Sequence, residues 1–428
     1  MRKSNLRLLI ILIVLLPFAF SGCWDYMEYE DLALVSAIGI DTADSGQVAV
    51  TLQYLIPGGG QGGGGSGGGG HGGIGKSART NPNVAIVSAT GPTIIDAVDS
   101  IQQYLDKKLF YGYMEVLIIG EDAARSLLTD FISLNDRTPQ LRTTAKLAIA
   151  EGKARDAVST VESSTTTSPG HYISEAIDKS AKTGNTTSVI VQDFIEYMEE
   201  EGVEPVAPRI KTYNSEAPGG GENSGKPAEG ASNVVRIKAR DGYHSISGIA
   251  IIKVEKLAGW FNKQEAKGFS WITGKQMVSY ESHKTIPGAK SNGILNYSIT
   301  KSKSRIKAGL DNGKPSITLD VSAKSAKLRK YVKTIESDDL TPDTINLLQK
   351  DLEETIRAEI DAALKKGQKD LKTDVFGFGQ AFYTKYPSLW HSTLKDKWDE
   401  IFPDIPVTVN VKAKLNTTGT TIKKFFLK

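Results

Sequence analysis

The segment that most constrains this chain is its first 23 residues. Residues 1–7 carry three basic side chains and no acid, and residues 8–20 form an apolar run broken by Pro17. A run of this length is too short to cross a bilayer as a helix, which takes about 20 residues, but it is typical of the core of a secretory signal peptide. We therefore expect residues 1–22 to be removed on export, and the rest of the chain to fold outside the cytoplasm.

The only cysteine of the chain, Cys23, follows this run directly after Ser21 and Gly22. This arrangement resembles the lipobox of bacterial lipoproteins, except that Phe20 stands where Leu, Val or Ile is usual. The resemblance implies cleavage after Gly22 and attachment of acyl chains such as palmitate at Cys23. A lone exposed thiol is a liability in an exported protein, and two acyl chains hold a protein on a bilayer stably. We expect a lipid-tethered protein; an ordinary signal peptide with an incidental cysteine is the alternative.

Composition excludes several classes of protein. A single cysteine rules out a disulfide framework and a cysteine-based zinc site. Of the 52 Lys and Arg residues, three lie in the leader, which leaves 49 against 49 Asp and Glu. A neutral body argues against a nucleic-acid binder, which needs a basic face. His171 and Glu175 stand one helical turn apart, but two ligands do not make a metal site, and we interpret them as a surface pair. No metal or cofactor is expected.

Residues 58–75 hold 14 glycines and predict a flexible loop that contributes no core. Inside this stretch, residues 70–77 match the phosphate-binding pattern G-x-x-x-x-G-K-S letter for letter. Phosphate binding by that pattern requires a strand directly before the loop and a helix directly after it. Here glycines precede it and residues 78–82 are not helical in character, so we interpret the match as a product of the glycine tract.

The sequence on either side of the glycine tract predicts an N-terminal α+β domain over residues 24–213. Residues 32–40 and 47–56 read as a hairpin, and Thr93 with Asp96 forms a capping box at the start of a helix. Further strands are predicted at 84–89, 110–120 and 142–150, and further helices at 121–134, 151–161, 174–180 and 189–201.

Residues 214–232 are rich in Gly, Pro, Ser and Glu and predict a linker. A second α+β domain is expected over 233–428, with a possible split near residue 285. Its strongest element is a helix capped by Thr341, whose apolar stripe we expect to dock on the domain's own sheet and not to form a coiled coil. The predicted fold class is α+β, with mixed or antiparallel sheets flanked by helices in two to three lobes.

No catalytic motif stands out: G-x-S-x-G and H-E-x-x-H are both absent, and we expect no catalytic residue. Aromatic residues are dense between residues 376 and 402. We interpret this block as an anchor for the long helix and the last strand. Its exposed members, with Trp390 and Trp398 as our candidates, are predicted to contact a partner.

Motifs spread along the mature chain resemble the C-subunit family of spore germinant receptors. They follow one another in order: GCWD at 22–25, DLALVSAIGID at 31–41, SATGPTI at 88–94, IIGEDAA at 118–124, GIAIIK at 248–253, KLAGW at 256–260, WITGK at 271–275, DVFGFG at 374–379 and WDEIF at 398–402. Two departures are Tyr113, where the family often has histidine, and the inserts at 58–75 and 216–232.

This resemblance implies a non-enzymatic, three-lobed α+β lipoprotein on the extracytoplasmic face of the spore inner membrane. Such subunits act with an A subunit and a polytopic B subunit in germination signalling triggered by nutrients. Trp24 and Asp25, beside the anchor, join Trp390 and Trp398 as predicted partner contacts. The sequence names no nutrient, and whether this subunit binds one directly stays open. The alternative is a solute-binding lipoprotein of a transporter, which would need a deep cleft between lobes. A surface hydrolase would need paired carboxylates facing a groove.

Overall fold

The computed structural model describes residues 28–55, 84–128, 130–131, 141–161, 168–214, 227–228, 231–237, 240–275, 280–283, 295–330 and 342–416. The predicted leader and lipobox, with Cys23, Trp24 and Asp25, and the glycine tract lie outside these ranges. No helix within them is both long and apolar enough to span a bilayer.

One large mixed sheet forms the N-terminal part of the molecule, with the strand order β12-β11-β8-β6-β5-β1-β2-β3-β10-β9. Its strands are β1 (Leu32–Thr42), β2 (Val48–Leu55), β3 (Val84–Gly91), β5 (Val116–Ile119), β6 (Lys146–Ala150), β8 (Val206–Asn214), β9 (Pro227–Ala228), β10 (Ala231–Ile237), β11 (Arg240–Lys253) and β12 (Lys256–Phe261). The short strands β4 (Lys108–Phe110) and β7 (Thr160–Val161) pair with β1 and β11. β1 is central and almost wholly buried, which explains why its sequence is a continuous apolar run instead of an alternating one.

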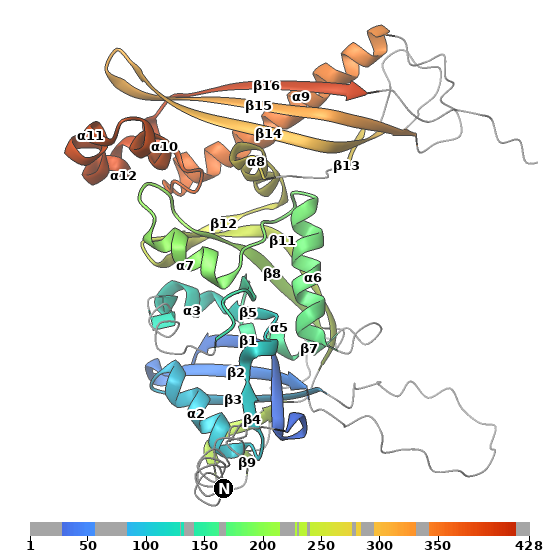
Figure 1. The fold of residues 1–428 in the computed structure, drawn as a ribbon, viewed down its shortest axis with the longest axis vertical. Helices are drawn as coiled ribbons and strands as arrows, with labels where there is room; N and C mark the ends of the chain where they lie inside the picture. The colour runs from blue at the N-terminus through green and yellow to red at the C-terminus, as the bar shows by residue number, and fades with distance from the viewer. Residues whose placement is uncertain are drawn as a thin grey trace, which may run out of the picture.

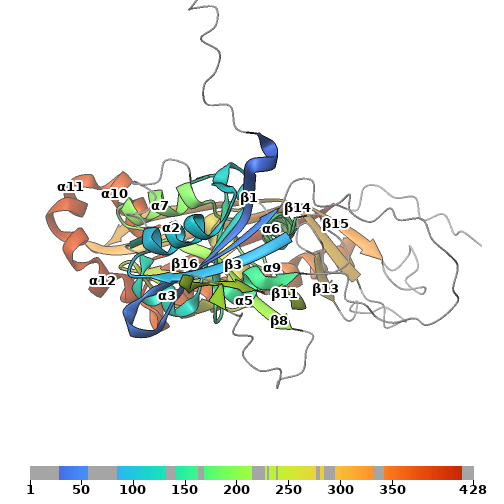
Figure 2. The same cartoon turned by 90° about the horizontal axis from the view of Figure 1, so that it is seen from below.

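Helices cover both faces of this sheet: α2 (Ile94–Tyr104), α3 (Glu121–Ser126), α5 (Ala154–Ser159), α6 (Pro169–Lys182) and α7 (Val191–Glu199). The predicted capping box at the start of α2 is confirmed, because Thr93 and Asp96 each accept a hydrogen bond from the other's backbone N–H. Figure 2 shows the turn η1 (Tyr29–Asp31) and the start of β1 projecting from the body of the protein.

The single strand predicted over residues 110–120 is wrong, because two strands and a turn occupy this stretch. β4 and β5 both pair with β1 in parallel, Leu34 opposite Phe110 and Ala37 opposite Val116. The partner segment is therefore three residues longer than β1 between these two pairs. The extra length forms a turn at Tyr111–Tyr113.

The large sheet continues beyond residue 233, where we predicted a new domain to begin. β10 pairs with β3, Val234 opposite Ala89, and β11 pairs with β8 from Gly242 onward. Alternation of apolar residues identifies a strand and its two faces, but it does not identify the neighbouring strand. The change of sheet comes later in the chain, between β12 and β13 (Tyr280–His283).

The second sheet has the order β13-β14-β15-β16, with β14 (Leu295–Asp311), β15 (Lys314–Lys330) and β16 (Val407–Asn416). It lies at one end of the long axis of the molecule, with β1, β2 and β3 toward the other end (Figure 1). Five helices accompany it: α8 (Lys263–Thr273), α9 (Pro342–Leu364), α10 (Phe378–Lys385), α11 (Pro387–Leu389) and α12 (Trp398–Ile401). α8 crosses α9 at Gly268, where an added Cβ would lie 2.0 Å from the carbonyl oxygen of Glu359.

The long helix α9 docks on its own sheet, as predicted. Leu348, Leu352, Ile356 and Ile360 are at most 2% exposed and belong to one core with the inward side chains of β15. This core also contains Val206, Ile249 and Ile251 from the large sheet, so the two lobes share buried contacts. Two helix-covered sheets, one of them mixed and large, confirm the α+β fold class.

The docked stripe of α9 gives a stability prediction. Ile356→Ala should lower the free energy of unfolding by about 2–5 kcal/mol, since it leaves a cavity in a fully buried site. Leu347→Ala, on the same helix but 49% exposed, should cost less than about 0.5 kcal/mol. Urea unfolding followed by tryptophan fluorescence measures both. Equal effects would mean that α9 is not docked as described.

Candidate functional site

The two lobes meet where the loop after α7 touches the segment before α10. The backbone N–H of Glu204 donates to the carbonyl of Asp374 at 2.8 Å, and the N–H of Gln380 donates to the carbonyl of Gly202 at 2.9 Å. A Cβ on Gly379 would lie 2.7 Å from the oxygen of Gly202. The backbones therefore approach at a distance that only glycine permits.

Asp374 is the centre of this junction. Its carboxylate is buried and accepts hydrogen bonds from the backbone N–H groups of residues 376–379, at 2.7–3.2 Å. It also accepts the indole N–H of Trp398 at 3.0 Å. Burial raises the pKa of Asp374 to about 6, although the N–H donors oppose this shift. One side chain thus fixes the turn into α10 and holds α12 against it.

Trp390 and Trp398, which we predicted as partner contacts, are only 2% and 8% exposed. Their rings lie 5.2 Å apart, and the indole N–H of Trp390 donates to Glu201 of the N-terminal lobe at 3.0 Å. Both rings therefore hold the chain's own elements together. Contact with a partner stays a prediction for these residues, and the most exposed large ring of the same block is Tyr383, at 41%.

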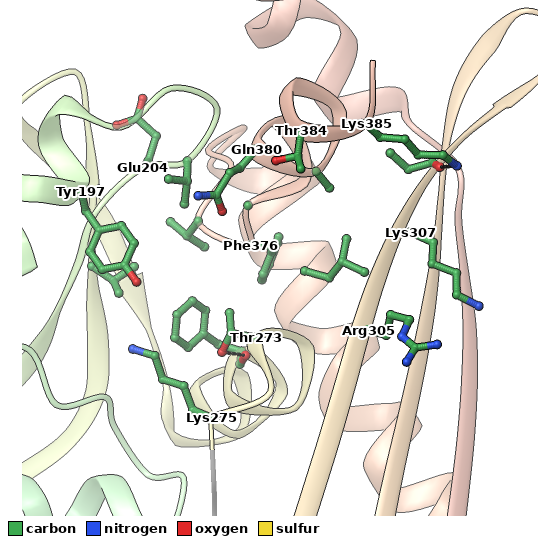
Figure 3. Close-up of a pocket in the computed structure, with 18 residues that line it drawn as sticks. Tyr197, Glu204, Thr273, Lys275, Arg305, Lys307, Phe376, Gln380, Thr384 and Lys385 are labelled. Carbon is green, nitrogen blue, oxygen red and sulfur yellow. Dashed lines mark hydrogen bonds between the residues drawn. The ribbon is translucent and has the colours of Figure 1, made fainter. Parts of the chain in front are cut away.

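A cleft of about 630 Å³ opens beside the junction, between α7 and β8 of one lobe and α8, β14 and α10 of the other (Figure 3). Its apolar wall comes from both lobes and includes Val206, Phe269 and Phe376. Its polar lining residues include Tyr197, Thr273, Lys275, Arg305 and Gln380. The cleft has the size and the mixed lining of small-molecule sites, which measure about 300–1,000 Å³.

Lys275 is the most constrained charged group of the cleft. Its ammonium donates to Thr187 Oγ1 at 2.7 Å and lies 5.5 Å from the ring centre of Phe269. None of the ion pairs in the described part of the chain involves Lys275. Burial lowers its pKa, and the negative charge of Asp193 opposes this shift. An ammonium has three N–H donors, so this one can still bind an anionic group.

Glu204 lines the cleft, but its carboxyl accepts a hydrogen bond from the backbone of Val254. Burial raises its pKa to about 7, and the nearby carboxylates of Asp399 and Asp374 act in the same direction. Asp399 is itself paired with Lys253, at 3.1 Å. Two carboxyl groups with raised pKa values thus lie on the two sides of the junction between the lobes.

The other residues considered from sequence stand apart from this site. His171 and Glu175 approach within 3.5 Å on the surface of α6, where both side chains are 51% exposed. Within the described ranges, no three His, Cys, Asp or Glu side chains come together as a metal site would require. Sequence reasoning missed Asp374 and Lys275 as centres of contact. The glycines of DVFGFG were the available signal for the first, since a carboxylate can cap a glycine-containing turn.

The fold and the cleft define a two-lobed α+β protein whose lobes meet over a candidate binding site. Residues 25–212 match the family model described as "Spore germination protein N-terminal domain". Residues 247–419 match the one described as "Spore germination B3/ GerAC like, C-terminal". The chain belongs to this GerAC-like family of spore germination proteins, which confirms the resemblance found in its motifs.

Relatives in Bacillus subtilis (strain 168) match almost the whole chain. Spore germination protein KC is 26% identical over 98% of this chain and 96% of its own length. Putative spore germination protein YfkR is 29% identical over 93% of each chain. Spore germination protein B3 is 23% identical over 94% of this chain and 95% of its own length. The crystal structure of the GerBC protein superposes with a TM-score of 0.51 at 20% identity, over 91% of this chain and 99% of that one, and shows the same fold.

The two raised carboxyl pKa values predict how stability depends on pH. A carboxyl whose pKa is higher in the folded state binds its proton more tightly there, so stability falls as the pH rises from the unfolded to the folded pKa. For Glu204 this window runs from 4.5 to about 7. Glu204→Gln should make this fall in the free energy of unfolding smaller by about 1–2 kcal/mol. The fall that remains in the variant, up to a pH of about 6, is assigned to Asp374.

Urea unfolding at pH values on either side of this window tests the prediction. Glu400→Gln, at an exposed position of α12, is the matched control and should leave the pH profile unchanged. A Glu204→Gln profile that overlays the wild-type profile would contradict the assignment to Glu204.

Proposed function

We propose that this protein is the lipid-anchored C subunit of a spore nutrient germinant receptor, acting with A and B membrane subunits in germination signalling. The observation that carries the proposal is where the family match begins. The N-terminal model starts at residue 25, directly after the lipobox-like sequence that ends at Cys23. A family domain that follows an acylation motif without a spacer fits a protein held at a membrane.

The tether implied by this arrangement is short. Only four residues separate Cys23 from Glu28, where the described structure begins. At about 3.3–3.6 Å per residue, the five steps between them span less than about 18 Å. An acylated Cys23 would therefore keep η1 and the start of β1 close to the bilayer, on the extracytoplasmic face of the spore inner membrane.

Replacing the anchoring residue tests the membrane assignment. Cys23→Ala should leave the folded body intact and release the protein from spore membranes, because the thiol is the only acylation site of the lipobox. Fractionation of spores followed by immunoblotting measures the distribution. Ser21→Ala, which keeps a small residue before the cysteine, is the control and should stay in the membrane fraction. High salt screens charge-based attachment, so a Cys23→Ala protein that stays in the membrane fraction after a high-salt wash would refute anchoring by lipid at this residue.

Partnership with A and B subunits is tested by copurification. The protein would be tagged at its C-terminus in the native host, solubilised from spore membranes in mild detergent and analysed by mass spectrometry. A polytopic membrane subunit and a second membrane subunit should copurify with it. A transporter permease with an ATPase would support the solute-binding alternative, and recovery of the bait alone would contradict a stable complex.

The cleft between the lobes favours a second candidate function, the binding of a small solute. Lys275 offers a half-buried ammonium at an apolar wall, which suits a molecule with a carboxylate and an apolar body. In a receptor subunit, such a solute would be a nutrient or an effector. In a transporter lipoprotein, it would be the cargo.

A charge-removing variant tests solute binding in this cleft. Amino acids and 3-phenylpropionate would be screened by chemical-shift changes, with the neutral 3-phenylpropionamide as the matched ligand. Lys275→Met should weaken carboxylate binding about tenfold or more, as loss of a charged hydrogen bond does. Lys256→Met, at an exposed position, should have no effect. Equal binding of the acid and the amide would exclude a role for Lys275.

A further inference from the structure

The C-terminal sheet has one covered face and one open face. Between residues 301 and 308 of β14, the even positions, such as Ser302 and Ala308, are buried or half-buried toward α8 and α10, while the odd positions are exposed. The exposed positions of this stretch are all basic: Lys301, Lys303, Arg305 and Lys307. Beyond it, at the end of the strand, Leu310 and Asp311 are exposed as well. In a strand, alternate residues share a face, so these four cations form one row on the face opposite to the one that α8 and α10 cover. Arg305 and Lys307 of this row also line the cleft.

The third strand of this face continues the pattern. Lys303 stands opposite Ser322 of β15, which stands opposite Lys412 of β16, and Lys414 follows on the same side. Lys412 and Lys414 are exposed. Directly opposed residues in neighbouring strands lie on the same face. We call the surface formed by Lys301, Lys303, Arg305, Lys307, Lys412 and Lys414 the basic face.

One carboxylate lies within the basic face. Asp320 of β15 pairs with Lys307 at 2.6 Å and accepts a hydrogen bond from Asn410 at 2.9 Å. Six cations therefore face one acid, although the chain beyond the leader balances 49 basic against 49 acidic residues. The neutral total that argued against a basic surface is an average over an uneven distribution, and the acids that balance this face lie elsewhere in the chain.

We propose that the basic face binds the anionic headgroup layer of a lipid bilayer. Successive outward residues of β14 are about 7 Å apart and β14 is about 10 Å from β16, so the charges form a nearly planar array and not a line. Lysine and arginine can lay their stems along the sheet and extend their charges to the headgroups. Such an array fits a flat, laterally fluid sheet of anions.

The surface lacks what other anionic partners require. Protein interfaces depend on buried aromatic or aliphatic anchors, and single-stranded nucleic acid is bound by stacking on aromatic rings. Among the described residues, none of the exposed large apolar side chains occupies an outward position between 301 and 307 of β14 or between 408 and 414 of β16. The basic face therefore offers a partner positive charge but no apolar anchor. An anionic membrane surface can be bound by positive charge alone.

Lipid binding by the basic face stands on these residues and does not rest on acylation of Cys23. If the proposed anchor is present as well, the protein has two attachments. The C-terminal sheet lies at the opposite end of the long axis from β1, β2 and β3 (Figure 1). Binding through both the lipid anchor and the basic face would therefore hold the long axis of the protein parallel to the membrane surface. Each basic side chain near an anionic surface contributes about fivefold in affinity, and screening confines the effect to within about 10 Å.

The test uses the mature chain from residue 23 with Cys23→Ala, which cannot be acylated, so its outcome is independent of the anchor. Binding to vesicles of phosphatidylglycerol and of phosphatidylcholine would be measured by sedimentation at low and high salt. The face variant replaces four lysines of the basic face by glutamine, Lys301, Lys303, Lys412 and Lys414. The control variant removes the same charge at four other exposed positions: Lys108, Lys256, Lys263 and Lys397.

We expect salt-sensitive binding to phosphatidylglycerol and little to phosphatidylcholine. The face variant, which loses four charges worth about fivefold each, should bind phosphatidylglycerol on the order of 600-fold more weakly at unchanged melting temperature. The control variant should lose far less. Failure of the parent chain to bind phosphatidylglycerol, or an equal loss in both variants, would overturn the proposal. The parent chain could instead fail to bind vesicles but bind poly-L-glutamate, with that binding lost in the face variant. The basic face would then be a docking site for an acidic protein.

Discussion

The fold depends on the buried carboxylate of Asp374. It satisfies four consecutive backbone N–H groups and an indole N–H, while its own carbonyl receives the N–H of Glu204 from the other lobe. A buried charge is tolerated only with such partners. The same residue therefore builds the turn that starts α10, fixes the aromatic block and joins the lobes. The cleft exists because this junction sets the two lobes at a defined separation.

Much of this architecture was predictable from local pattern. The capping box at Thr93 and the stripe of α9 follow from rules that act within a few residues, and both were right. The break between β4 and β5 and the return of β10 to β3 depend on how distant strands pair, which alternation does not encode. The motifs identified the family. Lys275 could not be recognised as a cleft residue, because its surroundings come from the loop between α6 and α7, from α8 and from α10.

Net charge was the least informative property of the sequence. The balance of 49 basic and 49 acidic residues is compatible with a uniform surface, yet β14 and β16 place six cations on one face. Period-two spacing of lysines was visible in residues 301–307. Its meaning depended on knowing that the even positions face α8 and α10, which only the packing shows. The kind of partner that a protein binds should therefore be inferred from the charge of each surface, and not from the net charge of the whole chain.

The pairing of β15 with β16 has a consequence for how the protein folds. These strands are parallel neighbours, Ile317 opposite Val407, about ninety residues apart in the chain. β16 follows α9 and the aromatic block in the chain, so the sheet is complete only after these segments have been synthesised and β16 has reached β15. Contacts so distant in sequence form slowly. Until then β15 presents an open edge to other chains. A protein of this design should depend on a chaperone, or on rapid collapse of α9, to protect that edge.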